Sequence, residues 1–165
     1  MTRLPLPLAA LAIVACAGAA EREGTLRARV AFPPQDTVRF TAPATARPCG
    51  RPGALVAHGS SGGNGVLLWL RYGDSLASGD YPVLVRSDTA TSHGAVVGVR
   101  FMTGALTHGT ALDSGVVTVS RARERVTARA RGSGPEVGGA RRARVEADFE
   151  ALVIGGDTVS CRPMP

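Results

Sequence analysis

The stretch Arg142-Ala-Arg-Val-Glu-Ala-Asp-Phe-Glu-Ala-Leu152 indicates the fold class of this chain. Apolar and charged side chains alternate along it, so its apolar residues share one face, as in a strand with one buried side. These residues are Ala143, Val145, Ala147, Phe149 and Ala151. Arg125-Val-Thr-Ala-Arg-Ala-Arg131 alternates in the same way and places Val126, Ala128 and Ala130 on one face. We predict an antiparallel hairpin with a loop from Gly132 to Gly139.

The charges of this hairpin suggest a register in which paired residue numbers sum to about 273. Arg125 then faces Asp148 and Arg123 faces Glu150, whereas Arg129 faces Arg144 and Arg131 faces Arg142. Like charges in opposed positions destabilise a sheet unless an anion neutralises them. We therefore predict an anion-binding or partner-binding site at the hairpin tip, formed by Arg129, Arg131, Arg141, Arg142 and Arg144. The alternative is a solvated face, because the chain has 19 arginines and no lysine and its composition is that of a GC-rich genome.

The rest of the mature chain also has β patterns, separated by turns rich in glycine, proline and aspartate. The stretches are 26–32, 37–41, 54–58, 66–72, 81–86, 95–102 and 115–121, and the segment 43–52 between two of them looks irregular. No stretch combines a sustained helical period with caps. We expect one domain over residues 25–165, with eight to ten antiparallel strands in a jelly-roll-like β-sandwich. A small β-barrel is the alternative, and either could carry a small apolar ligand or lipid between its walls.

The first fifteen residues fit an export signal, because Arg3 precedes an apolar segment that is too short to span a membrane. Ile13-Val14-Ala15-Cys16 resembles the lipobox of bacterial lipoproteins. That resemblance implies a lipid thioether on Cys16, cleavage before it, and a short tether over residues 16–24. It also implies attachment to the outer membrane facing the periplasm, since residue 17 is Ala and not Asp. Ordinary secretion into the periplasm or medium is the alternative, because Ala17-Gly18-Ala19 also suits a signal peptidase.

A looser resemblance extends over about half of the chain. Gly79-Asp-Tyr-Pro-Val83, Ser114-Gly-Val-Val-Thr-Val119 and Val145-Glu-Ala-Asp-Phe149 are similar to strands of uncharacterised exported β-sandwich lipoproteins. This resemblance implies a sandwich and an envelope location, and it implies no activity.

Cys49 and Cys161 remain as a pair if Cys16 carries lipid. In an oxidising envelope we expect them to form a disulfide. The alternative, a metal site, lacks a second cysteine or histidine within four residues of either cysteine. We expect no metal and no cofactor.

The net charge of +6 favours anionic partners such as lipid headgroups, lipopolysaccharide or acidic polymers, and an envelope protein is a further candidate. We do not expect nucleic acid in that compartment. The favoured function is therefore a non-enzymatic binding or interaction module.

Gly59-Ser60-Ser61-Gly62-Gly63 matches the G-x-S-x-G pattern of serine hydrolases, with Ser61 as the nucleophile. That motif needs a helix after the serine and parallel βαβ units, which this sequence does not predict. A hydrolase using Ser61 is the last alternative. No two of the three histidines, His58, His93 and His108, are spaced along the sequence as metal ligands are. We expect them to face solvent in loops.

Overall fold

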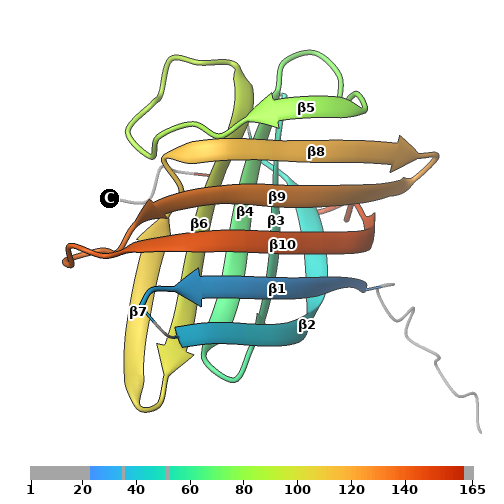
Figure 1. Ribbon diagram of the computed structural model, residues 1–165. Helices are drawn as coiled ribbons and strands as arrows, with labels where there is room; N and C mark the ends of the chain where they lie inside the picture. The colour runs from blue at the N-terminus through green and yellow to red at the C-terminus, as the bar shows by residue number, and fades with distance from the viewer. Residues whose placement is uncertain (1–22, 35, 51–52, 162–165) are drawn as a thin grey trace, which may run out of the picture.

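The computed structural model describes residues 23–34, 36–50 and 53–161, and it is shown in Figure 1. The export signal and Cys16 lie outside these residues. The described residues form ten strands: β1 (Gly24–Phe32), β2 (Asp36–Pro48), β3 (Ala54–Ser61), β4 (Asn64–Tyr72), β5 (Gly79–Pro82), β6 (His93–Thr103), β7 (Leu106–Ala111), β8 (Ser114–Ala122), β9 (Arg125–Pro135) and β10 (Arg142–Val153). The described residues form no helix, so none is long and apolar enough to cross a membrane. The predicted all-β class is confirmed.

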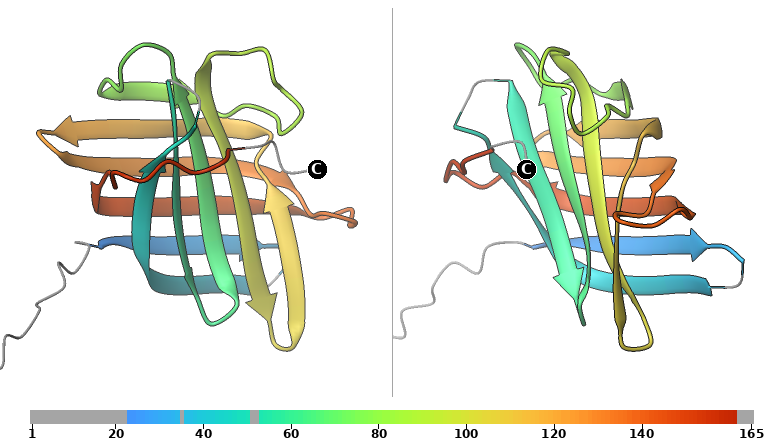
Figure 2. Two further views of the ribbon diagram at one scale, coloured as in Figure 1. Left: turned by 180° about the vertical axis from the view of Figure 1, so that it is seen from behind. Right: turned by 90° about the vertical axis from the view of Figure 1, so that its left-hand side faces the viewer.

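All ten strands belong to one antiparallel sheet in the order β5-β8-β9-β10-β1-β2-β3-β4-β6-β7. The sheet curls because β2 belongs to both of its halves: Asp36–Ala44 pairs with β1, and Ala44–Pro48 pairs with β3. The strands β3, β4, β6 and β7 consequently cross the direction of β1, β8, β9 and β10 (Figures 1 and 2). Two separate sheets, as in the expected jelly-roll-like sandwich, are not observed. The curvature of this half-barrel fits the alternative, a small barrel.

Backbone bonds join the two halves at opposite corners of the curl. Val83, just after β5, bridges Ala95 on β6, and Thr110 on β7 bridges Glu136, just after β9. The amide of Leu112 also donates to the carbonyl of Val97 over 2.9 Å. These contacts hold the halves together over a filled core.

The apolar faces predicted for the last hairpin line this core. Val126, Ala128, Ala130, Ala143, Val145, Ala147 and Phe149 are all at most 2% exposed. The largest fully buried side chains packed with them include Phe32, Tyr81 and Phe101. Ala151 departs from the prediction: it has φ +54°, and the register shifts there, so that Leu152 takes the buried place.

The predicted register of this hairpin is wrong. In the structure Asp148 faces Arg129 and Glu146 faces Arg131, so the paired numbers sum to 277. The predicted loop was too long, because β9 continues to Pro135 and its glycines are strand residues. A Cβ on Gly132 would meet the carbonyl oxygen of Ser114, and a Cβ on Gly134 would meet that of Ala111. These glycines permit close packing of the backbone and do not form the turn.

The segment 43–48, expected to be irregular, is the second half of β2. Proline is tolerated in a strand where its missing N–H would face an unpaired edge. The amide of Gly155 donates to the carbonyl of Ala46 on the side of β2 that β1 occupies further along. Since backbone polar groups alternate between the two edges of a strand, the nitrogen of Pro43 faces the other edge, where β3 has not yet begun.

The residues after β10 form a C-terminal strap, Ile154–Cys161, which runs parallel to the last residues of β2 (Figure 2). The amide of Val159 donates to the carbonyl of Pro48, and the amide of Gly50 donates to that of Val159, both over 2.9 Å. Cys161 forms a disulfide with Cys49, as predicted, across 112 positions of sequence. Cys49 packs against Trp69 and Ala54 in a small apolar cluster separate from the main core.

Candidate functional site

The structure divides the five arginines predicted to form a cluster at the hairpin tip: two of them pair with acidic residues away from the outer face of the sheet, and three remain on that face. Arg142 makes a bidentate pair with Asp113, at 2.9 and 2.5 Å. Arg141 lies 3.5 Å from Glu136, with its guanidinium 3.8 Å from the centre of the Phe32 ring. Arg129, Arg131 and Arg144 stay on the outer face of the sheet.

The pair between Arg142 and Asp113 is the strongest of these ion pairs by geometry. The hydrogen bonds from Arg142 hold the pKa of Asp113 below its usual value, and the same bonds raise the pKa of Arg142. Arg142 is therefore held at the turn before β8 by Asp113.

A row of charged residues crosses the outer face from β2 to β9. Arg39 faces Arg29, Arg29 faces Glu146, and Glu146 faces Arg131. Glu146 lies 3.9 Å from Arg29 and 3.5 Å from Arg131, so the two arginines share one carboxylate. Among the described residues no carboxylate lies within ion-pair distance of Arg39.

Arg144 extends this row, two residues before Glu146 on the same outward face of β10. Its cross-strand neighbours are Ala31 and Ser133, and no described carboxylate pairs with it. We call Arg29, Arg39, Arg131, Arg144 and the enclosed Glu146 the arginine cluster. Four arginines and one glutamate give it a formal charge of +3, half of the +6 of the whole chain.

The next row along the strands is balanced. Nη1 of Arg27 donates to both carboxylate oxygens of Glu150, at 2.8 and 2.7 Å, and Arg129 donates to Asp148 over 2.8 Å. On this part of the outer face the excess of positive charge thus lies in the arginine cluster, because Arg27 and Arg129 in the next row are paired with carboxylates.

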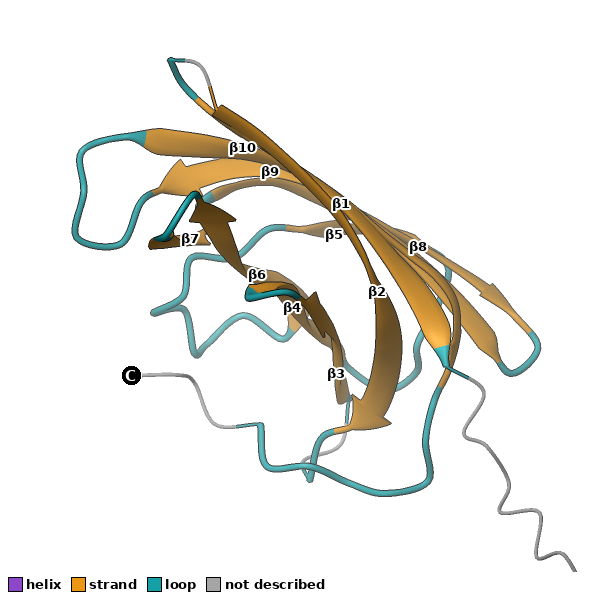
Figure 3. Ribbon diagram, turned by 90° about the horizontal axis from the view of Figure 1, so that it is seen from below, coloured by secondary structure: helices purple, strands orange, loops and turns teal. Residues whose placement is uncertain are grey.

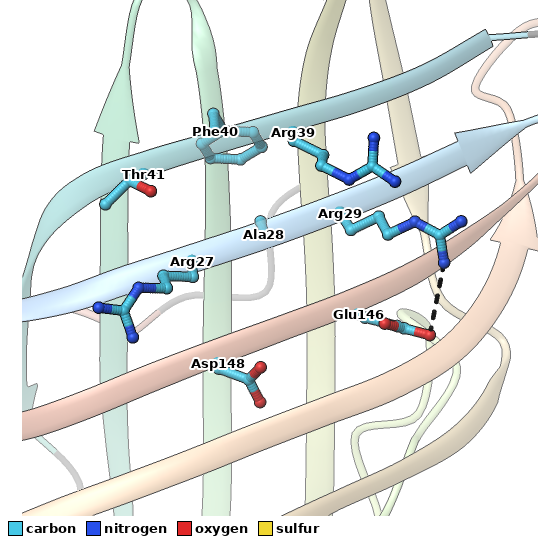
Figure 4. Close-up of a pocket in the computed structure, with 8 residues that line it drawn as sticks. All are labelled: Arg27, Ala28, Arg29, Arg39, Phe40, Thr41, Glu146 and Asp148. Carbon is cyan, nitrogen blue, oxygen red and sulfur yellow. Dashed lines mark ion pairs between the residues drawn. The ribbon is translucent and has the colours of Figure 1, made fainter.

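An open groove of about 460 Å³ runs between these rows on the outer face. It is lined by Arg27, Ala28, Arg29, Arg39, Phe40, Thr41, Glu146 and Asp148. Figure 4 shows the side chains of Arg29 and Arg39 next to each other on adjacent strands, with Glu146 paired to Arg29 and not to Arg39. Opposed like charges cost stability, so an anion bound between Arg29 and Arg39 would remove a repulsion as well as gain two contacts.

A second polar group that the sequence did not predict lies at the rim of the core. The ring of His108 on β7 lies 2.6 Å from Glu136 through Nδ1 and 2.6 Å from the Thr103 hydroxyl through Nε2. His108 is buried, stacks on Phe101 at 5.2 Å between ring centres, and contacts the tilted ring of Phe32 at 5.0 Å. The expectation that His108 faces solvent in a loop is therefore wrong. Strand β7, which the pattern analysis missed, turns the ring toward the core.

The order hydroxyl, imidazole and carboxylate is also found in hydrolase triads. Here the carboxylate is shared with Arg141, and the hydrogen bond from His108 together with that guanidinium holds the pKa of Glu136 below its usual value. The contacts join the β1, β6–β7 and β9–β10 regions, and we interpret them as a clamp that closes the rim of the curl.

The other two histidines lie apart from this clamp. His58 lies on the exposed side of β3, 3.1 Å from the hydroxyl of Thr45, and His93 stacks on Tyr81 at 4.4 Å. Within residues 23–34, 36–50 and 53–161, no three His, Cys, Asp or Glu side chains form a group that could hold a metal ion.

Ser61 lies at the end of β3, where Gly62 and Gly63 form a two-residue turn to Asn64 on β4. A strand follows the serine, so the strand-to-helix turn of the hydrolase motif is not formed.

Sequence reasoning missed Arg29 and Arg39, which come from the first two strands. Their alternation with buried residues could have placed each of them on an outer face. The pairing of β1 with β10, which brings Arg29 to Glu146, joins the two ends of the domain and leaves no local signal.

Comparison with known proteins gave no significant match to a protein family, a curated protein or a solved structure.

Proposed function

We propose that this protein is a lipid-anchored protein of the bacterial cell envelope whose β domain binds an anionic partner through the arginine cluster. The anchor is the lipid on Cys16, and the location is the outer membrane, facing the periplasm. The domain acts as a binding or interaction module, not as an enzyme. Its scaffold is a small, incompletely closed barrel.

One observation carries the binding role. Four arginines surround a single carboxylate, and Arg39 and Arg144 pair with no described acidic residue. Arginine side chains bind carboxylate, phosphate and sulfate groups through paired hydrogen bonds, which makes such a cluster suited to an anionic ligand.

Retention on immobilised heparin, a sulfated polyanion, tests the binding role. The full chain is extracted in a non-ionic detergent and compared with the double variant Arg39→Gln/Arg144→Gln. We expect about tenfold weaker binding at 0.15 M salt, because two exposed charge contacts are lost.

The matched control is Arg123→Gln/Arg125→Gln, which removes the same charge from the far end of β9 and the turn before it. This control is expected to bind nearly as well as the wild type. Equal losses in both variants would mean that net charge and not the arginine cluster governs retention, and would contradict the proposal.

The anchor is tested by the intact mass of protein extracted from its own membrane. A mass equal to residues 16–165 plus acyl chains supports lipidation of Cys16. An unmodified mass beginning after Cys16 would contradict the anchor and would place the domain among secreted or periplasmic proteins.

A further inference from the structure

The first half of β2 has a free backbone edge. Strand β2 pairs with β1 through Asp36–Ala44, but β3 covers its other side only from Ala44 to Pro48. No described strand pairs with the seven residues Thr37–Pro43 on that side, and in Figure 3 no strand runs alongside them there. An unpaired edge of this kind can accept a further strand.

The groups that face this edge follow from the alternation of the strand. The carbonyl of Ala46 accepts from the strap on the side of β1, so even-numbered residues of β2 direct their backbone groups there. Thr37, Arg39 and Thr41 therefore present their N–H and C=O groups to the free edge. Three such residues are enough for an added strand of about seven residues.

The two terminal strands of the sheet, β7 and β5, leave less of their backbone edge unpaired. On β7 the amide of Val137 donates to the carbonyl of Gly109, and Thr110 bridges Glu136, so the segment after β9 covers that edge. On the other side β5 has only four residues and ends in a proline. The edge of β2 is the longest unpaired one in the described part of the chain.

The charges of the neighbouring strands indicate what kind of strand would fit. Arg129 and Arg131 on β9 lie beside the acidic residues of β10, and so do Arg27 and Arg29 on the other side of β10. Strand β2 follows with Arg39, which faces Arg29 and has no acidic strand next to it. An acidic strand on the free edge would place negative charge beside Arg39, as β10 does for Arg27 and Arg29.

The inner face of β2 gives the second half of the pattern. Val38 and Phe40 point inward but are only partly buried, in contrast to the buried Ala42 and Ala44 further along. Apolar side chains at alternate positions of an added strand would cover them. The expected ligand therefore alternates acidic and apolar residues, as Val145–Phe149 of β10 does itself.

We propose that the free edge of β2, Thr37–Pro43, binds an extended acidic segment of another polypeptide as an additional strand beside Arg39. The inference rests on the proposed function, since it names the partner of the arginine cluster.

The test uses the full chain in non-ionic detergent and a fluorescein-labelled peptide of nine residues in which glutamate alternates with valine or threonine. Binding is followed by fluorescence anisotropy. Methylation of the four central peptide nitrogens removes main-chain hydrogen bonds without changing the charges, and we expect binding to weaken by at least about tenfold. The same residues with the glutamates grouped at one end are expected to bind equally weakly.

Two protein variants distinguish the contribution of the backbone edge to peptide binding from that of the charge of Arg39. Thr41→Pro removes one N–H from the free edge and is expected to weaken peptide binding about fivefold, whereas Thr41→Ala keeps the N–H and leaves it unchanged. Arg39→Gln is expected to weaken it about threefold to fivefold, and the control Arg125→Gln not at all. If Thr41→Pro fails to fold, the methylated peptide decides alone.

Equal binding of the methylated and unmethylated peptides, or of Thr41→Pro and Thr41→Ala, would overturn strand addition. The proposed function would still stand if retention on heparin depended on Arg39 and Arg144. A chain that binds anionic vesicles in preference to neutral ones, and does not bind the peptide, would also overturn this inference and assign the arginine cluster to a lipid surface. If the chain binds neither the peptide nor heparin, the proposed function is contradicted as well.

Discussion

Arg131 on β9 lies directly opposite Glu146 on β10, with 3.5 Å between Nη1 and Oε2, and Arg29 lies 3.9 Å from the same carboxylate. One glutamate therefore restrains two arginines that face it from opposite sides, and both are about half exposed. Exposed pairs of this kind contribute at most about 1 kcal/mol to stability. The carboxylate matters more for the potential of the surface than for the fold.

The first prediction follows from this geometry. Glu146→Gln removes the only acidic residue of the arginine cluster, so we expect heparin to bind about threefold more tightly. The unfolding free energy is expected to change by less than about 1 kcal/mol. Affinity is measured by the salt concentration needed for elution, and stability by denaturant unfolding.

Glu150→Gln provides the matched control, because it makes the same change of charge on the same face of β10. Glu150 pairs with Arg27 and lies outside the arginine cluster. An equal gain in affinity from Glu150→Gln would show that heparin responds to net charge alone and would count against a defined site.

The second prediction concerns the close packing of β9. A Cβ on Gly134 would meet the carbonyl oxygen of Ala111, which is backbone and cannot move aside easily. We expect Gly134→Ala to lower the unfolding free energy by about 1–3 kcal/mol, the usual cost of overpacking. Gly156→Ala is the control, since nothing lies within 4 Å of its added Cβ, and it should change stability by less than about 0.5 kcal/mol. Equal stabilities would contradict the observed register of β9.

These glycines also explain how far the sequence could predict the fold. Alternation of polar and apolar residues correctly assigned the buried face of β9 and β10, because burial on one face leaves a local record with a period of two. The register in which β9 pairs with β10 leaves no such periodic pattern in the sequence. Gly132 and Gly134 resemble turn residues, and only the backbone of the segment 111–114 next to them shows why they are glycine.

The candidate site was predictable only in part, for a related reason. Arg131 and Arg144 were expected to face outward and do so, but their neighbours were assigned from a single hairpin. The partners that decide the charge balance, Arg29 and Arg39, reach the site through the pairing of β1 with β10 and β2. Contacts between strands more than a hundred residues apart cannot be read from local alternation.

The third prediction is a dependence of stability on pH. The hydrogen bond from His108, with the Arg141 guanidinium close by, holds the pKa of Glu136 below its usual value of 4.5. A carboxylate with a lowered pKa in the folded state stabilises that state above its unfolded pKa, and this contribution is lost as the pH falls through the lowered value. We expect Glu136→Gln to lower the melting temperature at pH 6, and the difference from wild type to shrink toward pH 3.

Asp74→Asn is the control for this experiment, because Asp74 is exposed in the turn after β4. Its effect on the melting temperature is expected to be small at both pH values. A difference for Glu136→Gln that stayed constant from pH 6 to pH 3 would mean that the clamp at the rim does not depend on the charge of Glu136.

The last prediction concerns the disulfide that fastens the C-terminal strap. Cys49 and Cys161 are 112 positions apart, and cross-linking so long a loop restricts the unfolded chain by about 4–5 kcal/mol in the entropic view. We expect Cys49→Ala/Cys161→Ala to lower the unfolding free energy by about 2–5 kcal/mol. Trp69, the only tryptophan, is 6% exposed and packs against Cys49, so its quenching by acrylamide reports whether the strap still covers this cluster. Quenching is expected to increase in the double variant and to stay unchanged in Ser160→Ala, an exposed residue of the same strap. If the double variant loses stability without increased quenching, the disulfide acts only on the unfolded chain, and the backbone bonds of the strap hold it in place.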